Sequence, residues 1–202
     1  GGSDPHVVLA DADLDRTVAA CGTSRLLNGG QSCISAKRFI VEAPIVDEFT
    51  ERLAAHMSGA VVGDPLDPAV TMGPMARHDL RDELHDQVVR SLEAGAELRM
   101  GGEIPDGPGA FYPPTILTGV TKGMAAYHEE TFGPVATVIA VEDVAEAVFV
   151  ANDTDFGLGA AIYTANVALG EQIARDRLHA GSCFVNDFVA SDPRLPFGGV
   201  KM

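Results

Sequence analysis

Residues 28–42 read Asn-Gly-Gly-Gln-Ser-Cys-Ile-Ser-Ala-Lys-Arg-Phe-Ile-Val-Glu, a glycine-rich turn that runs directly into an apolar strand. A helix is expected before this turn, because Leu14, Val18 and Cys21 fall on one helical face. Helix, turn and strand in this order are typical of crossover units, whose strands pair in parallel. This stretch therefore predicts an α/β fold with a parallel sheet.

The remainder of the chain keeps the same alternation. We expect an extended edge segment at 111–117, because its two prolines cannot donate to a sheet ladder. Hydrophobic periodicity predicts strands at 6–10, 38–42, 97–100, 135–141, 158–163 and 182–185, and helices at 14–25, 44–57, 77–94, 142–152 and 166–179. The predicted fold is α/β, a three-layer, open, mainly parallel sheet with helices on both faces, and residues 1–202 form one domain.

Composition excludes several classes of partner. The 202 residues carry a net charge of −15 and contain 46% hydrophobic residues, which is typical of a globular domain. Nucleic acids and anionic membranes are bound through Lys and Arg, so neither is expected as a partner. No run of about 18 apolar residues and no signal-like start is present in the sequence, so neither membrane spanning nor export is predicted.

The three cysteines, Cys21, Cys33 and Cys183, are widely spaced and form no Cys-x-x-Cys pair. We expect neither a disulfide framework nor a zinc site, and therefore reduced thiols in the cytoplasm. Cys21 and Cys183 are expected in the core. His78 and His85 are expected on the polar side of one helix without a third ligand, so no metal site is predicted.

Cys33 differs from the other two cysteines because it follows two glycines and a serine. Such a turn holds the sulfur outward and leaves the backbone N–H free to stabilise an oxyanion, as a nucleophile attacking a carbonyl requires. The alternative is a buried structural cysteine. The sequence contains no Gly-x-Gly-x-x-Gly and no Walker-type loop, so no phosphate cradle is predicted within it.

Three motifs in order resemble the aldehyde dehydrogenase superfamily. Residues 28–33, Asn-Gly-Gly-Gln-Ser-Cys, resemble its active-site Gly-Gln-x-Cys motif. Residues 129–135, Glu-Glu-Thr-Phe-Gly-Pro-Val, and 195–201, Leu-Pro-Phe-Gly-Gly-Val-Lys, resemble two further family segments. The resemblance covers the whole chain, and residues 186–196 are most similar to the succinate-semialdehyde dehydrogenase branch.

The resemblance implies a role for five residues. Cys33 would add to the aldehyde carbon, pass a hydride to NAD or NADP, and release the acid when water hydrolyses the thioester. Glu130 would bind the nicotinamide-ribose hydroxyls, and Phe132 would press against the ribose and nicotinamide. Ser191 would hold the substrate carboxylate, although it also fits a simple turn, and Phe197 would line the substrate tunnel.

Parts of the family's machinery are not among residues 1–202. By resemblance, Gly1-Gly2 ends the motif Glu-Leu-Gly-Gly, whose glutamate is the general base, although these glycines could also be a cloning scar. The oxyanion asparagine and the cofactor-binding domain belong to the N-terminal half, and both ends of the chain look truncated. We expect the chain alone to be inactive and the full-length protein to be a homodimer or homotetramer.

Several alternatives stay open at this point. Where longer semialdehyde dehydrogenases carry an arginine six residues before the cysteine, this chain has Leu27, so a less polar small aldehyde is possible. A second alternative is a relative that transfers the acyl group to coenzyme A. A third is a non-catalytic assembly module. The choice between NAD and NADP is not fixed by these residues.

Overall fold

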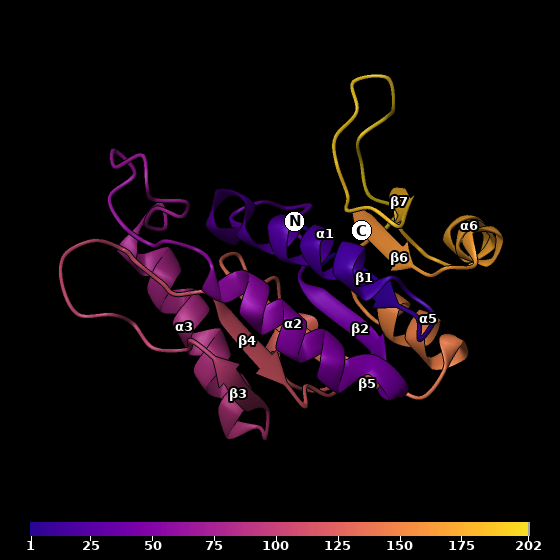
Figure 1. The fold of residues 1–202 in the computed structure, drawn as a ribbon, viewed down its shortest axis with the longest axis horizontal. Helices are drawn as coiled ribbons and strands as arrows, with labels where there is room; N and C mark the ends of the chain where they lie inside the picture. The colour runs from indigo at the N-terminus through magenta and orange to yellow at the C-terminus, as the bar shows by residue number, and fades with distance from the viewer. Residues whose placement is uncertain (202) are drawn as a thin grey trace.

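The computed structural model describes residues 1–201, which fold around one seven-stranded sheet (Figure 1). Its strands are β1 (Pro5–Val8), β2 (Arg38–Glu42), β3 (Glu97–Met100), β4 (Thr115–Thr118), β5 (Val135–Val141), β6 (Gly159–Tyr163) and β7 (Ser182–Val185). The helices are α1 (Leu14–Leu26), α2 (Val46–Ser58), α3 (His78–Glu93), α4 (Ala125–His128), α5 (Val144–Asn152) and α6 (Val167–Asp176), with short 3₁₀ turns η1 (Leu27–Gly30) and η2 (Ala43–Ile45).

The strand order across the sheet is β3-β4-β5-β2-β1-β6-β7, and every neighbouring pair is parallel except β3 with β4. Parallel neighbours need crossover connections, which the helices supply. Strand β5 is a continuous apolar run whose residues are buried except at Ala140, as expected for a strand covered on both faces. The predicted mainly parallel sheet is confirmed.

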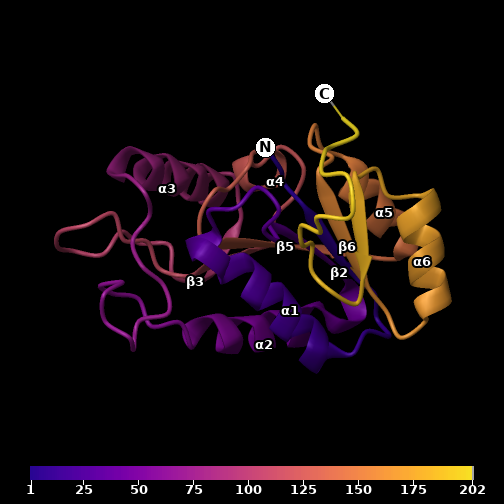
Figure 2. The ribbon, with the colours of Figure 1, turned by 90° about the horizontal axis from the view of Figure 1, so that it is seen from above.

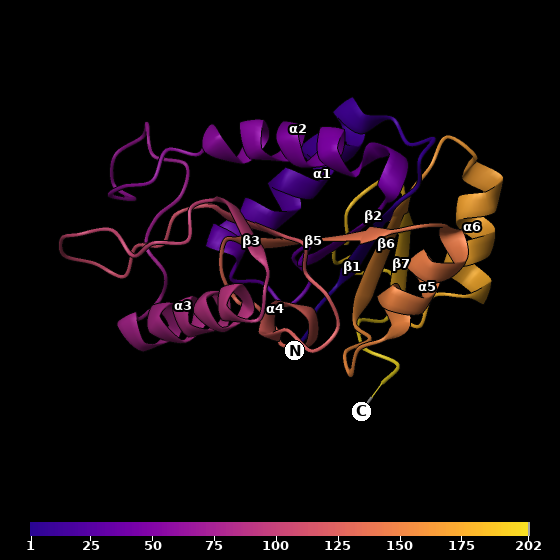
Figure 3. The ribbon, with the colours of Figure 1, turned by 90° about the horizontal axis from the view of Figure 1, so that it is seen from below.

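Helices cover both faces of the sheet, so the molecule has three layers. Figure 3 shows α1 and α2 on one face and α3, α4 and α5 on the other. One core cluster joins the sheet to α1 and α2 through Cys21, Phe49, Leu53 and Met57, and a second joins it to α3, α5 and α6. Phe49, Leu53 and Met57 therefore form the inner face of α2, within the helix predicted at 44–57.

The predicted edge position of residues 111–117 is wrong. Strand β4 lies inside the sheet, between β3 and β5, and begins only at Thr115, after the two prolines. Prolines that precede a strand do not interrupt its ladder, so the argument from missing donors does not apply here. The edge is formed instead by the antiparallel strand β3.

A second difference concerns His85, expected on the solvated side of α3. This side chain is half-buried, and its Nδ1 lies 3.1 Å from the Tyr112 hydroxyl. The third concerns α6, which ends at Asp176 rather than His179, because residues from 178 onward turn toward β7. Neither difference changes the order of strands and helices.

Four segments far apart in sequence meet at the amino ends of the parallel strands. Gly2 precedes β1, Cys33 and Lys37 precede β2, Glu130 precedes β5, and Gly159 begins β6. Because these strands are adjacent and parallel, their first residues lie side by side at the amino-terminal end of the sheet. Figures 2 and 3 show the N-terminus beside α4, the helix that leads to Glu130.

Within residues 1–201, no helix is long and apolar enough to cross a membrane.

Candidate active site

Cys33 lies on a turn that three left-handed residues make possible. Asn28, Gly29 and Gly30 have φ values of 54°, 61° and 74°, which reverse the chain between α1 and β2. Asparagine and glycine tolerate this conformation better than other residues do. Cys33 itself is half-buried, and its N–H donates to no acceptor within residues 1–201. Thiol and free N–H therefore sit together, as predicted.

Gly30 is required by a backbone contact as well as by its φ. A Cβ at this position would lie 2.2 Å from the carbonyl oxygen of Gly133, just before β5. The fully buried Arg25 fixes the same junction, since its guanidinium donates to the carbonyls of Gly30 (2.6 Å) and Val135 (3.3 Å). These contacts hold the cysteine turn next to the segment before β5, which carries Glu130.

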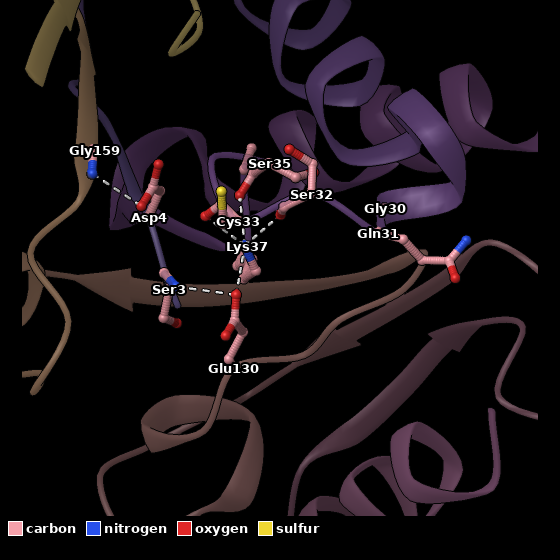
Figure 4. A network of polar contacts seen from close by, with 12 residues as sticks. Ser3, Asp4, Gly30, Gln31, Ser32, Cys33, Ser35, Lys37, Glu130 and Gly159 are labelled. Atoms are coloured by element: carbon pink, nitrogen blue, oxygen red, sulfur yellow. Dashed lines mark hydrogen bonds and ion pairs between the residues drawn. The ribbon is translucent and has the colours of Figure 1, made fainter. Parts of the chain in front are cut away.

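Lys37 lies beneath the turn and is only 1% exposed. Its Nζ donates to three carbonyl oxygens of the turn, those of Ser32 (3.0 Å), Cys33 (3.1 Å) and Ser35 (3.3 Å). Figure 4 shows these groups around the ammonium, with the Glu130 carboxylate on its other side. The distance from Lys37 Nζ to Glu130 Oε1 is 3.7 Å.

The two glycines at the start of the chain touch both Cys33 and Glu130. The N–H of Gly2 donates to Glu130 Oε1 at 3.0 Å, and a Cβ on Gly2 would lie 2.2 Å from the Cys33 carbonyl oxygen. A Cβ on Gly1 would lie 2.3 Å from Glu130 Oε2. Only glycine permits the approach of residue 2 to the Cys33 backbone, so Gly2 has a structural role in the site.

The adjacent acids Glu129 and Glu130 have different environments. Glu129 is held by Arg90 (2.7 and 2.9 Å) and Gln87 (3.0 Å), and the hydrogen bond from Arg90 is the main cause that lowers the pKa of Glu129. Glu130 points the other way, toward Gly2 and Lys37. Glu129 is therefore held by α3 and Glu130 by the residues around the cysteine turn, although both border the same cavity.

Glu130 and Phe132 line one cavity of about 470 Å³ together with residues of α3 and with Phe156. The Phe132 ring is 39% exposed, and the Glu130 side chain is 21% exposed. A carboxylate acceptor beside an accessible aromatic face fits the ribose diol and the ring of a nicotinamide. The residues present therefore fit the part of NAD or NADP that the sequence assigns to them.

Asp4 adds a buried acid next to Lys37. Its Oδ1 accepts from the N–H of Gly159 (3.1 Å), and its Oδ2 has no partner within residues 1–201. Burial raises the pKa of Asp4 to about 6, against the opposing effects of Lys37, the Gly159 hydrogen bond and Arg38. The site therefore rests on a set of buried, mutually compensating charges.

Within residues 1–201, no hydrogen bond joins Ser191 or Phe197 to the cysteine turn. Both are exposed, Phe197 by 56%, on the loop that follows β7. Figure 2 shows this loop along one side of β7, with α6 on the other side. The loop is tied to β6 through Val200, whose N–H donates to the Gly157 carbonyl at 3.1 Å.

Leu27, where the longer semialdehyde enzymes have arginine, is 58% exposed and lines a separate cavity with His56 of α2. Cys21 is fully buried, as expected. Cys183 in β7, also expected in the core, is only half-buried, as Cys33 is, and it packs against the rim of one core cluster. Burial raises the pKa of Cys183 to about 11.

Sequence reasoning missed Lys37 and Asp4 as site residues. Both flank recognised motifs, but burial of a charged side chain leaves no periodic signal in a sequence. One signal was available: lysine is rare in this chain, with three in 202 residues. A lysine four residues after a candidate nucleophile therefore deserved separate consideration.

The comparison with known proteins now decides the family. The model of the aldehyde dehydrogenase family matches residues 1–202, the whole chain. The chain belongs to the aldehyde dehydrogenase family. The family that the three sequence motifs indicated is therefore confirmed.

Among curated aldehyde dehydrogenases, the chain is 50% identical over 201 residues to the succinate-semialdehyde dehydrogenase [NADP(+)] of Mycobacterium avium (strain 104), and it covers 42% of that protein. It is also 50% identical to succinate semialdehyde dehydrogenase [NAD(P)+] Sad of Escherichia coli (strain K12), covering 43%. In both cases all of this chain is aligned. The chain spans less than half the length of these relatives.

Solved structures show the same fold. The succinic semialdehyde dehydrogenase of Streptococcus pyogenes, in complex with NADP+, superposes with a TM-score of 0.95 at 41% identity, and the chain covers 44% of it. Lactaldehyde dehydrogenase from Escherichia coli gives a TM-score of 0.96 at 36% identity, with 42% covered. Both alignments include 100% of this chain. The three-layer fold is that of the aldehyde dehydrogenases.

Proposed function

We propose that this chain is the cysteine-bearing part of an NAD(P)-dependent aldehyde dehydrogenase that oxidises succinate semialdehyde to its carboxylic acid. The observation that carries the proposal is that Gly2, the cysteine turn and the Glu130 segment meet at the amino ends of the parallel strands. The Cys33 carbonyl contacts Gly2, and Gly2 donates to Glu130. A nucleophile and a cofactor-binding carboxylate are thereby brought into one site.

Cys33 acts as the nucleophile in this proposal. Its thiolate forms a C–S bond with the aldehyde carbon, and the carbonyl electron pair moves to oxygen. The free Cys33 N–H stabilises the resulting oxyanion, together with an asparagine that is not among residues 1–202. Loss of hydride from the same carbon leaves a thioester on Cys33, and water then breaks its C–S bond to release the acid.

Glu130 and Phe132 position the hydride acceptor. NAD or NADP supplies that acceptor when bound. The Glu130 carboxylate accepts hydrogen bonds from the ribose hydroxyls, and the exposed Phe132 ring packs against the sugar and nicotinamide. Most other contacts to the cofactor come from outside residues 1–202, which fits the absence of a Gly-x-Gly-x-x-Gly motif in this sequence.

Succinate semialdehyde is the proposed substrate because the curated relatives at 50% identity carry that name. We assign carboxylate binding to Ser191 and tunnel lining to Phe197, on the loop after β7. Three free cysteines support a reducing compartment, the cytoplasm. A homodimer or homotetramer is the proposed assembly of the full-length protein, as the family resemblance implies.

The direct test is alkylation of the three cysteines by iodoacetamide as a function of pH, with each site followed by mass spectrometry. We expect Cys33 to react fastest of the three cysteines. Millimolar succinate semialdehyde slows the reaction of Cys33 but not that of Cys183. Butyraldehyde, which lacks the carboxylate, protects less well.

The outcomes separate the alternatives. Equal protection by both aldehydes contradicts carboxylate recognition and favours a less polar small aldehyde. Slow alkylation of Cys33 that neither aldehyde reduces contradicts the catalytic proposal and favours an assembly module.

A further inference from the structure

The burial of Lys37 is not explained by the reaction as proposed so far. Its side chain is 1% exposed, and burying an ammonium is unfavourable unless it is paired and hydrogen-bonded. The other two lysines are placed differently. Lys122 is 63% exposed and pairs with Asp153, and Lys201 binds carbonyls at the end of α5. Only Lys37 is directed at the nucleophile turn.

All three carbonyl oxygens that Lys37 binds belong to residues 32–35, the turn that carries the thiol. These bonds hold the carbonyls on the ammonium side, while the Cys33 N–H has no acceptor within residues 1–201. A turn fixed at three points cannot rotate this peptide group without breaking charge-assisted hydrogen bonds. The lysine thereby fixes the orientation of the thiol and of the oxyanion donor.

Four charged or titratable groups face the Lys37 ammonium. Burial lowers the pKa of Lys37 to about 8 and the Arg25 charge lowers it as well, whereas Asp4, Glu130 and Cys33 act in the opposite direction. Two carboxylates therefore keep the buried amine protonated near neutral pH. The effect of Cys33 is reciprocal, because a thiolate that favours the ammonium is favoured by it to the same extent.

We propose that Lys37 is a positioning residue for Cys33, whose ammonium fixes the 32–35 turn and attracts the charge of the Cys33 thiolate. The inference rests on the proposed role of Cys33 as nucleophile. The same ammonium lies 3.7 Å from Glu130 Oε1, so one charge orients the nucleophile turn and the cofactor-binding carboxylate together. Lys37 touches neither substrate nor cofactor and acts through these two residues.

The first test is the pH profile of Cys33 alkylation in Lys37→Met, which keeps the side-chain length and removes the charge. We expect the rate of Cys33 alkylation at pH 7 to fall about tenfold, as loss of a nearby opposite charge predicts. Lys122→Met removes the same charge from an exposed site and leaves the profile unchanged. A wild-type profile in a folded Lys37→Met protein overturns the proposal.

A second measurement does not require Lys37 to be replaced. With three lysines in the chain, their Cε signals can be resolved by NMR, and Lys37 is assigned as the one that titrates near pH 8. In Cys33→Ser, which lacks the thiolate, Lys37 is expected to titrate at lower pH than in the wild type. Equal midpoints in the two proteins overturn the proposal, whether or not Lys37→Met folds.

These readouts separate this inference from the proposed function. Failure of aldehydes to protect wild-type Cys33 contradicts the dehydrogenase proposal, while a shifted profile in Lys37→Met still supports the link between lysine and thiol. If aldehydes protect Cys33 but the Lys37→Met profile is unchanged, the dehydrogenase proposal is supported. The proposed positioning role of Lys37 is then contradicted.

Discussion

His6 is the buried titratable residue whose effect on stability is easiest to isolate. It is fully buried in β1, and its Nδ1 lies 3.1 Å from the Tyr163 hydroxyl. Burial, with the Arg25 and Lys37 charges, lowers the pKa of His6 to about 3 from the usual 6.5. Between these two values the unfolded chain binds a proton that the folded chain does not, so the free energy of unfolding falls as pH decreases below 6.5.

We therefore predict that acidification from pH 7 to pH 4.5 costs the wild type about 3 kcal/mol more than it costs His6→Asn, since one pH unit of unequal protonation is worth about 1.4 kcal/mol. Urea unfolding of both proteins at the two pH values measures the difference. His78→Asn, at an exposed position, is the control and should match the wild type. Equal acid sensitivity of wild type and His6→Asn would show that His6 is protonated in the folded protein.

At the scale of elements, the joint between the cysteine turn and the segment before β5 depends on Gly30. Gly29 and Gly30 have similar left-handed φ values, 61° and 74°, but different surroundings. A Cβ on Gly29 meets side-chain atoms at 3.5 Å or more, whereas a Cβ on Gly30 meets the Gly133 carbonyl oxygen at 2.2 Å. Substituting alanine at each of these two glycines therefore distinguishes the cost of the left-handed backbone from the cost of steric overlap.

Gly29→Ala is predicted to lower the free energy of unfolding by about 1 kcal/mol through the left-handed conformation alone. Gly30→Ala adds the overlap and is predicted to cost about 1–3 kcal/mol more. Chemical denaturation of both variants gives these values. Because the joint holds Cys33 near Glu130, Gly30→Ala should also weaken aldehyde protection of Cys33, and equal effects of the two substitutions would contradict the role of the backbone contact.

At the scale of the whole molecule, the site lies at the amino ends of β1, β2, β5 and β6, not at the carboxyl ends where ligands of open parallel sheets usually bind. The residues that reach this edge supply a thiol, a carboxylate and an ammonium. By family resemblance, the general base and the oxyanion asparagine are not among residues 1–202. We therefore propose that these strand ends form one side of the catalytic site, which further residues complete.

We predict that the isolated 202-residue chain gives no appreciable NAD(P)H formation with succinate semialdehyde, although its Cys33 is alkylated rapidly. Adding the N-terminal domain as a separate chain should restore turnover with the wild type and not with Cys33→Ser. Absorbance at 340 nm measures both reactions. Robust turnover by the isolated chain would mean that residues 1–202 contain their own base and cofactor contacts.

The sequence by itself determined the order and type of most elements, because hydrophobic periodicity and glycine or proline punctuation are local properties. Strands 38–42, 97–100, 135–141 and 182–185 were predicted with the bounds that the structure shows. The sequence motifs also identified the family, and they pointed to Cys33, Glu130 and Phe132. The placement of Glu130 and Phe132 on one cavity agrees with their proposed joint role.

Only the tertiary structure decided which strand is the edge, what each of two adjacent glutamates binds, and which charges are buried beneath the cysteine. Strand neighbours follow from pairing between segments that are distant in sequence, as for β4 between β3 and β5. Glu129 and Glu130 are adjacent and of the same residue type, and in the structure Arg90 on α3 binds Glu129. Lys37 became part of the site because folding removed it from water and left the Cys33 turn and two carboxylates as its partners.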